Sequence, residues 1–237
     1  MGRLRILSGG AAQGLVNALA PAFQAETGFE LDGTFGAVGA MRAKLRAGEV
    51  ADVVILTSAL ITELAREGHV IGESAIDVGA VQTSIAVRTG DAAPSIGNEE
   101  SLRRALVDAT AIYFPDPEQA TAGIHFASVL RKLGIWHELE GRLQTYPNGA
   151  TAMRQLAAST AERPVGCTQT TEILSTQGVT LVGPLPKGFD LATVYTAAVG
   201  AKSPHADVAK QLVSVLTGEG ARAQRQRAGF LSDPQAR

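Results

Sequence analysis

The chain has 237 residues, of which 45% are hydrophobic and 19% charged, and its formal net charge at pH 7 is -2. This is the composition of an ordinary globular protein, long enough to bury a core in one large domain or in two lobes. The near-neutral charge is spread along the chain, which disfavours binding to nucleic acid or to an anionic membrane surface, and no run reaches the length of a membrane span. With one cysteine and four scattered histidines, we expect no intrachain disulfide, no metal and no other cofactor.

The N-terminus gives an indication of location. Gly2 and Arg3 lead directly into a strand-like apolar run, without the apolar stretch and small-residue cleavage site of a secretory signal peptide. The sequence as written therefore predicts a cytoplasmic protein, and a periplasmic one if it is the mature form of a longer chain. An ABC permease is an expected partner only in the second case.

Short apolar runs alternate with segments of helical period, which is typical of βα units wound into mostly parallel sheets. In the first third of the chain we expect strands at 4–7, 29–34 and 51–56. A helix should follow each strand, and Gly28 can end the first one. The buried faces of these helices are marked by Leu15, Val16, Leu19 and Phe23, by Met41 and Leu45, and by Leu60, Ile61 and Leu64.

The same pattern continues in the rest of the chain, so the predicted fold class is α/β. A second lobe is expected to begin near residue 82. Further strands are predicted at 83–87, 111–114, 165–168 and 192–200. Further helices are predicted at 99–109, through 126–133, after an Asn148 cap, and twice near the C-terminus.

Three turns that follow strands in the first lobe carry small or hydroxyl-bearing residues. Ligands of parallel sheets bind beyond the carboxyl ends of the strands, where free N–H groups and the helix dipole favour an anion. Ordinary turn chemistry, with Ser8 as a simple helix cap, is the alternative at each turn. Taken together, the turns predict an anion pocket. Its expected contacts are Ser8, Gly9, Gly10, Ala11, Thr34, Gly36, Ala37, Val38, Thr57 and Ser58.

Polar or small residues also follow strands in the second lobe. The expected ligand contacts there are Thr121, Ala122, Gly123, Asn148, Thr168 and Gln169. Asp116 belongs either to this set or to a plain Asp-Pro turn. His125 lies near a helix N-terminus, where the dipole favours the neutral imidazole that can accept a proton; a helix-surface position is the alternative.

Two other residues are interpreted as structural. Cys167 has no base partner in the sequence and is expected to be a small buried hydrophobe. Arg42 lies in the second helix, where it can reach a carboxylate ligand or form a surface salt bridge, and we favour the salt bridge.

The order of these motifs resembles the type II periplasmic binding protein family, most closely its molybdate-binding branch. The resemblance covers nearly the whole chain. It rests on Leu7-Ser8-Gly9-Gly10-Ala11, Gly33-Thr34-Phe35-Gly36, Gly48-Glu49-Val50-Ala51-Asp52-Val53-Val54, Pro115-Asp116-Pro117 with Ala122-Gly123, and Val165-Gly166. It implies two α/β lobes, each with a mostly parallel sheet flanked by helices and with a small anion in the cleft between them. Lobe I would be 1–82 and 196–237, and lobe II would be 83–195.

The resemblance leaves the ligand and the activity open. Molybdate binders of this kind hold a tetrahedral oxyanion with a serine-rich turn, whereas this chain has Phe35-Gly36-Ala37-Val38 there. The family commonly has a tyrosine where Cys167-Thr168-Gln169 stands. These differences favour a planar carboxylate over a tetrahedral oxyanion.

The same fold is similar to that of aconitate isomerases, which move an allylic proton. That activity needs donors for several carboxylates and one positioned base, for which His125 and Ser8 are the candidate catalytic residues. A third hypothesis is a small-molecule sensor acting through another protein, because no helix-turn-helix precedes the first strand.

Overall fold

A computed structural model describes residues 2–231, which form two compact units. Unit 1 consists of Met1–Val81 and Thr193–Arg237, and unit 2 of Gln82–Ala192. The chain crosses between the units within the long strand β4 (Ile76–Arg88) and again at the start of β9 (Ala192–Val199). Both ends of the chain therefore contribute to unit 1.

Unit 1 has a sheet whose strand order is β2-β1-β3-β9. β1 (Gly2–Gly9) is parallel to β2 (Phe29–Gly36) and to β3 (Val53–Thr57), and β9 is antiparallel to β3. The other elements of the unit are η1 (Gly10–Ala12), α1 (Gln13–Thr27), α2 (Val38–Arg46), α3 (Ser58–Arg66), η2 (Gly72–Ser74), α9 (Ala206–Thr217), η4 (Glu219–Ala221) and α10 (Arg222–Ala228).

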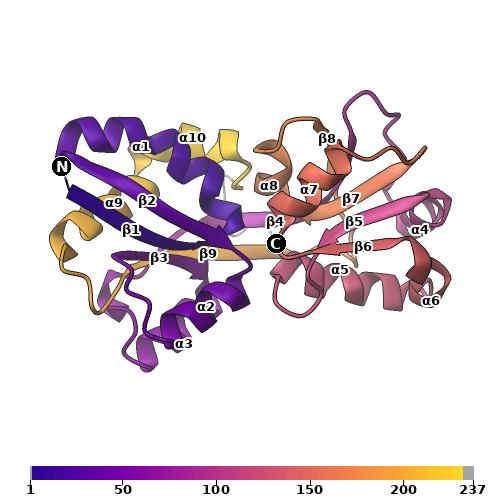
Figure 1. Cartoon of the computed structure of the whole chain (residues 1–237). Coiled ribbons are helices and arrows are strands. Elements are labelled where there is room, and N and C mark those ends of the chain that lie inside the picture. The colour runs from indigo at the N-terminus through magenta and orange to yellow at the C-terminus, as the bar shows by residue number, and fades with distance from the viewer. Residues whose placement is uncertain (1, 232–237) are drawn as a thin grey trace. The chain divides into compact units, whose positions relative to one another are not determined.

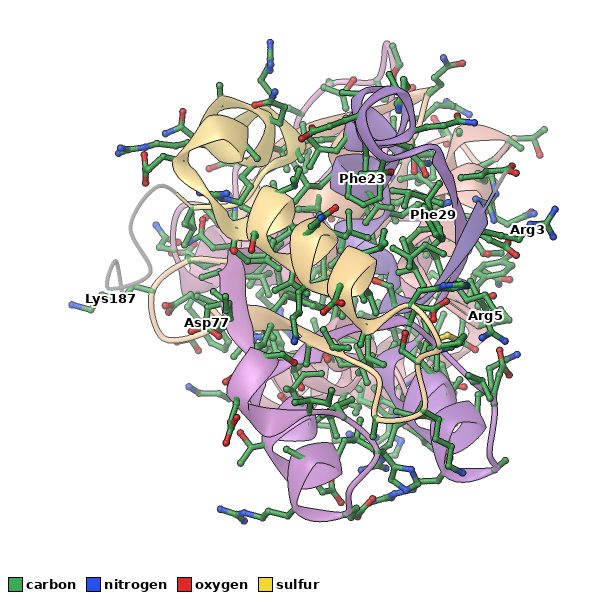
Figure 2. The ribbon with its side chains drawn as sticks, turned by 90° about the vertical axis from the view of Figure 1, so that its left-hand side faces the viewer. Arg3, Arg5, Phe23, Phe29, Asp77 and Lys187 are labelled. Carbon is green, nitrogen blue, oxygen red and sulfur yellow. The ribbon has the colours of Figure 1, made fainter. Side chains whose placement is uncertain are left out.

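Helices cover both faces of the unit 1 sheet. In Figure 1, α1, α9 and α10 lie on one face, and α2 and α3 lie on the other. Phe23 of α1 is 2% exposed and lies inside the unit, whereas Arg3 on β1 projects outward (Figure 2). As the sequence indicates, α1 ends at Gly28, whose φ of 74° is left-handed and costs little in a residue without a Cβ.

Unit 2 has a sheet with the order β4-β7-β5-β6, and β8 pairs with β4. β5 (Ala111–Pro115) is parallel to β6 (Leu143–Tyr146) and β7 (Pro164–Gln169), and β4 is antiparallel to β7 and to β8 (Val179–Pro184). The helices are α4 (Glu99–Asp108), α5 (Thr121–Lys132), α6 (Trp136–Leu139), η3 (Glu140–Arg142), α7 (Gly149–Ala157) and α8 (Thr170–Leu174).

Each face of the unit 2 sheet has its own apolar cluster. Ile85 and Ala86 are successive residues of β4, and they belong to different clusters because neighbouring side chains of a strand point to opposite faces. α7 and α8 cover one face and α5 the other (Figure 1). Within the described part of the chain, no helix is long and apolar enough to cross a membrane.

The predicted α/β fold class is confirmed, but several strand boundaries differ. β2 continues to Gly36, two residues beyond the predicted end, and β4 starts at Ile76 instead of residue 83. The sequence analysis missed the short strands β6 and β8. No side chain of either strand is fully buried, so neither has the continuous apolar pattern of a central strand.

Candidate functional site

Three helices of unit 1 begin at the same edge of its sheet. Gly9 and Gly36 are paired in the β1/β2 register, and Ser8 is opposite Ile55 of β3, so the three strands end together. The segments that follow start α1 through η1, α2 and α3, and none of them has a side-chain cap or an acidic residue in its first turn. The backbone N–H groups of these helix starts therefore have no side-chain or acidic partner from their own segments.

The predicted contacts of unit 1 fall at this edge, with one exception. Ser8, Gly9, Gly36 and the first residues of the helices lie there, whereas Thr34 is an exposed residue inside β2. Ser8 is fully buried and does not cap a helix, because its hydroxyl donates to the carbonyl oxygen of Gly9 at 2.8 Å. A Ser8 hydroxyl that binds an anion has to give up this local hydrogen bond.

A tyrosine that the sequence analysis missed lies against the same turn. A Cβ added to Gly9 would lie 3.1 Å from Cε1 of Tyr195 and 2.9 Å from Cγ1 of Val38. Tyr195 is 2% exposed and pairs with Thr57 across β3 and β9. Glycine at position 9 is thus required for close packing. The only signal in the sequence was one tyrosine with two threonines in an otherwise apolar strand.

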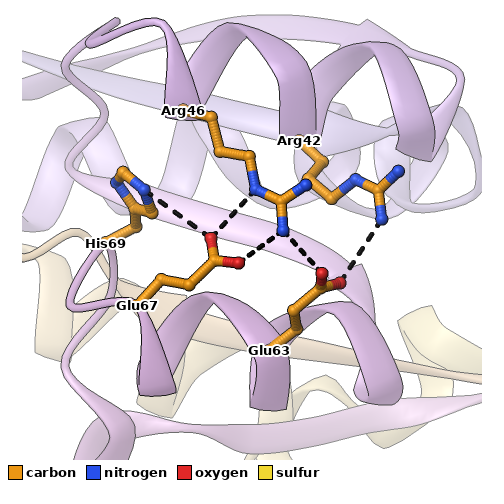
Figure 3. A network of polar contacts seen from close by, with 5 residues as sticks. All are labelled: Arg42, Arg46, Glu63, Glu67 and His69. Carbon is orange, nitrogen blue, oxygen red and sulfur yellow. Dashed lines mark hydrogen bonds and ion pairs between the residues drawn. The ribbon is translucent and has the colours of Figure 1, made fainter.

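An ion-pair network holds α2 and α3 side by side (Figure 3). Arg46 bonds both Glu63 and Glu67, Arg42 bonds Glu63 at 3.3 Å, and His69 lies 3.7 Å from Glu67. The hydrogen bonds from Arg46 lower the pKa of Glu67. Arg42 therefore has the predicted salt-bridge role, and the network joins the C-terminal halves of the two helices.

Two cavities that lie within single units have charges of both signs in their linings. One of about 500 Å³ in unit 1 is lined by Arg66 and Asp77 together with Ser58. One of about 510 Å³ in unit 2 is lined by Asp91, Asp108 and Glu162 and by Arg163. Neither lining has an excess of positive charge, so the helix starts at the strand ends are the better anion site.

The loop between β5 and α5 in unit 2 is held by the side chain of Asp116. Oδ1 of Asp116 accepts hydrogen bonds from the N–H groups of Glu118 and Gln119, as in an Asp-Pro turn. A Cβ on Gly123 would lie 2.2 Å from the Asp116 carbonyl oxygen, so this glycine allows α5 to pack against the loop. Thr121 is the first residue of α5. This helix has no acidic residue in its first turn and no side-chain cap.

His125 is half-buried and bonded to the backbone. Its Nε2 lies 2.7 Å from the carbonyl oxygen of Phe189. Because a carbonyl oxygen only accepts, Nε2 carries the proton, and Nδ1 is the nitrogen left to accept one. His125 can act as a base only through Nδ1.

The start of α7 is occupied by a carboxylate of the same unit. Asn148 caps this helix as predicted, accepting from the N–H of Thr151 at 2.8 Å. The buried Glu172 accepts hydrogen bonds from the Thr168 hydroxyl and from the N–H groups of Gly149, Ala150 and Gln169. Burial nevertheless raises the pKa of Glu172, against the effect of these donors. The Thr168 hydroxyl is thus already bonded to Glu172, which the sequence analysis missed.

Cys167 is a buried core residue, and the histidines of the described chain are not gathered into a metal-binding cluster. Cys167 is fully buried in the β7 core, and burial raises the pKa of its thiol well above the ordinary value. Among residues 2–231, no group of three or more His, Cys, Asp or Glu side chains is placed to hold a metal ion.

Two α/β units define a protein with a periplasmic-binding-protein-like fold. The sheet of unit 1 is mostly parallel, as expected, whereas that of unit 2 is mixed, because β4 is antiparallel to its neighbours β7 and β8. Residues 4–231 match the sequence profile of a family described as bacterial extracellular solute-binding protein, so the chain belongs to that family. A curated relative, an aconitate isomerase from Pseudomonas sp., is 27% identical over 227 residues, which are 92% of this chain and 83% of the relative.

Solved structures show the same fold. The periplasmic molybdate-binding protein of Azotobacter vinelandii has a TM-score of 0.80 at 19% identity, covering 96% of this chain and 98% of that one. The sulfate-binding protein of Mycobacterium tuberculosis has a TM-score of 0.75 at 19% identity, covering 97% of this chain and 86% of that one. These similarities show that this fold has been used to bind small oxyanions.

Replacing Gly149 by alanine tests the packing of Glu172. The added Cβ would lie 2.0 Å from Oε2 of Glu172 and from Oγ1 of Thr168, so it should displace the buried carboxylate from its donors. We expect Gly149→Ala to lower the free energy of unfolding by about 2 kcal/mol or more in urea denaturation. Gly141→Ala is the control, because nothing lies within 4 Å of its added Cβ, and it should change stability little. Equal effects of the two substitutions would contradict the packing.

The pH dependence of stability tests the environment of Glu172. Burial raises its folded-state pKa above the ordinary value of 4.5, so the folded protein binds the proton more readily than the unfolded chain does. Its contribution to stability is therefore present below pH 4.5 and is lost as the pH rises through the folded-state pKa. Glu172→Gln does not titrate. Relative to this variant, the wild type should lose stability with rising pH in that window, and a relative gain would rule out the raised pKa.

Proposed function

We propose that the protein binds a small anion, either a carboxylate or an oxyanion, through helix N-termini and Ser/Thr hydroxyls at the ends of its strands. The observation that carries this proposal is the joint start of α1, α2 and α3 at one sheet edge, without a side-chain cap or first-turn acid. Such N–H groups and helix dipoles favour a negative charge. In unit 2, the uncapped start of α5 is a further donor set.

The turn at the start of α2 supports a carboxylate over a tetrahedral oxyanion. Its residues Gly36, Ala37 and Val38 offer backbone N–H groups but no hydroxyl. A planar carboxylate has two oxygens to be satisfied, whereas a tetrahedral oxyanion has four. Molybdate and sulfate are the named ligands of two proteins with this fold, so both classes belong in a binding test.

A permease is the partner that such a binder would serve. One solved structure of the same fold is the substrate-binding domain of a putative molybdenum ABC transporter from Clostridium difficile, with a TM-score of 0.69. Delivery to a permease requires location outside the inner membrane. A cytoplasmic copy would bind its anion for another purpose.

The second candidate function is the isomerisation of an unsaturated polycarboxylate. The observation that favours it is the 27% identity to an aconitate isomerase across 92% of this chain. An allylic proton transfer needs a base that is free to take the proton, and Nδ1 of His125 meets that requirement because Nε2 is held by Phe189. Ser8 and the helix N-termini would bind the carboxylates.

A cap introduced at α3 tests the anion site. Thr57 lies at the N-cap position of α3 with no side-chain hydrogen bond, so Thr57→Asp would place a carboxylate on the helix start. We expect the helix to be stabilised and the affinity for small anions to fall by at least about tenfold, because the carboxylate takes the N–H groups and repels the ligand. Isothermal titration with carboxylates, molybdate and sulfate measures this.

Thr57→Asn is the matched control for that experiment. Asparagine caps the same N–H groups without adding a charge, so its effect on affinity should be smaller than that of aspartate. Unchanged affinity in both variants would remove α3 from the site.

A conservative substitution separates the base from the structural role of His125. In His125→Gln, the side-chain amide can still donate to the Phe189 carbonyl oxygen but cannot act as a base. If the protein is an isomerase, proton NMR in deuterated water should show exchange and interconversion of cis- and trans-aconitate by the wild type. The variant should bind both compounds without turnover. Turnover by the variant would remove His125 from the mechanism.

A further inference from the structure

Two paired strands of unit 2 bury polar side chains that have no hydrogen-bond partner. Gln169, at the end of β7, is 2% exposed, and both its Nε2 and Oε1 are unpaired. Thr83 of β4 is fully buried, and its Oγ1 is unpaired as well. Buried polar groups are nearly always satisfied in folded proteins, since each unsatisfied one costs free energy. A ligand or a water molecule can satisfy these side chains.

The register of β4 and β7 places the two residues together. Thr83 is directly opposite Gln169 in the antiparallel pair, so their side chains share one face of the sheet. The next residues along the chain are fully bonded: Ser84 and Thr170 share a hydrogen bond of 2.7 Å, and Thr170 also reaches the carbonyl oxygen of Gln82 at 2.9 Å. The unpaired groups thus lie beside a well-bonded network, at the strand end where ligand contacts are expected.

The chemistry of a carboxamide defines what its partner must offer. The amide nitrogen of Gln169 donates, so an anionic oxygen can satisfy it. The amide oxygen only accepts, so a fully deprotonated anion cannot bond it, whichever way the amide is turned. The Thr83 hydroxyl can donate or accept and adapts to either case. A ligand that by itself satisfies both atoms of the amide therefore brings both an acceptor and an O–H or N–H donor.

We propose that Gln169, with Thr83, is a specificity subsite that selects anions bearing an O–H group. This inference rests on the proposed anion binding and narrows its ligand class. The O–H group can belong to a hydroxycarboxylate or to a protonated oxyanion such as hydrogen phosphate. An anion that lacks the O–H cannot bond the buried amide oxygen, and sites built to bond a hydroxyl discriminate strongly against analogues without it.

Matched ligand pairs test the subsite. Hydrogen phosphate and sulfate have the same shape and charge at mildly alkaline pH and differ by one O–H, and malate differs from succinate by one hydroxyl. Isothermal titration of the wild type should show at least about tenfold tighter binding of the O–H member in one of the pairs. The pair that shows it identifies the source of the O–H group. In Gln169→Met, which keeps the length of the side chain, that ratio should fall to near one.

Two further variants separate binding from stability. Thr83→Val and Thr171→Val each remove a buried, unpaired hydroxyl, and Thr171 is 3% exposed in α8, outside the strand pair. Both should raise the melting temperature, because an unsatisfied polar group is replaced by a methyl group of similar size. Only Thr83→Val should reduce the preference for the O–H member. If Gln169→Met does not fold, the loss of preference in Thr83→Val tests the subsite on its own.

The outcomes distinguish this subsite from the anion site as a whole. Equal or tighter wild-type binding of sulfate and succinate overturns the subsite and leaves anion binding in place. A preference that survives both Gln169→Met and Thr83→Val, or that is lost equally in Thr171→Val, overturns it as well. If the wild type binds none of the four anions, nor any other anion of the carboxylate, molybdate and sulfate panel, anion binding itself fails and the subsite fails with it.

Discussion

Parallel pairing aligns the ends of neighbouring strands, and the binding chemistry of both units depends on this alignment. In unit 1, the pairing of Gly9 with Gly36 makes two strands end level, so the helices that follow start side by side. In unit 2, Pro115 is opposite Tyr146, with the same consequence for the loops after β5 and β6. A shift of one residue would turn every side chain of a strand to the other face, so the apolar cores fix the register and the register fixes the helix starts.

The helix starts differ in what satisfies their N–H groups. At α7, the N–H groups are bonded by Asn148 and by the buried Glu172, both from unit 2. At α1, α2 and α3, no capping side chain or first-turn acid is present. Helices α5, α8, α9 and α10 also begin without a side-chain cap. The feature that favours a ligand is therefore the gathering of three such helix starts at one sheet edge, and not the missing caps alone.

The sequence predicted the fold class and most elements because apolar periodicity and turn glycines are local signals. It also located the edge of each sheet where strands end, since that follows from alternating strands and helices. It did not predict which of these turns are already bonded by side chains of the same unit. Thr168 was predicted to be a ligand contact, but its hydroxyl is bonded to Glu172. The Glu172 carboxylate fits there because Gly149 has no Cβ, and this contact between separate elements cannot be read from the local sequence. The closeness of Tyr195 to Gly9 likewise depends on β9, which is almost 190 positions away in the chain.

The buried amide of Gln169 also bears on the ligand of a binder and on the substrate of an isomerase. A fully ionised polycarboxylate has only acceptor oxygens, so it satisfies the amide nitrogen and cannot bond the amide oxygen. Such a substrate gains less from this residue than a hydroxyl-bearing anion does. If aconitate is the substrate, the amide oxygen has to be satisfied by Thr83, by water or by a protonated carboxyl group. Only in the last case does binding weaken as the pH rises and that proton is lost. The same holds for a binder of a fully ionised carboxylate, so Gln169 discriminates among ligands and not between the two functions.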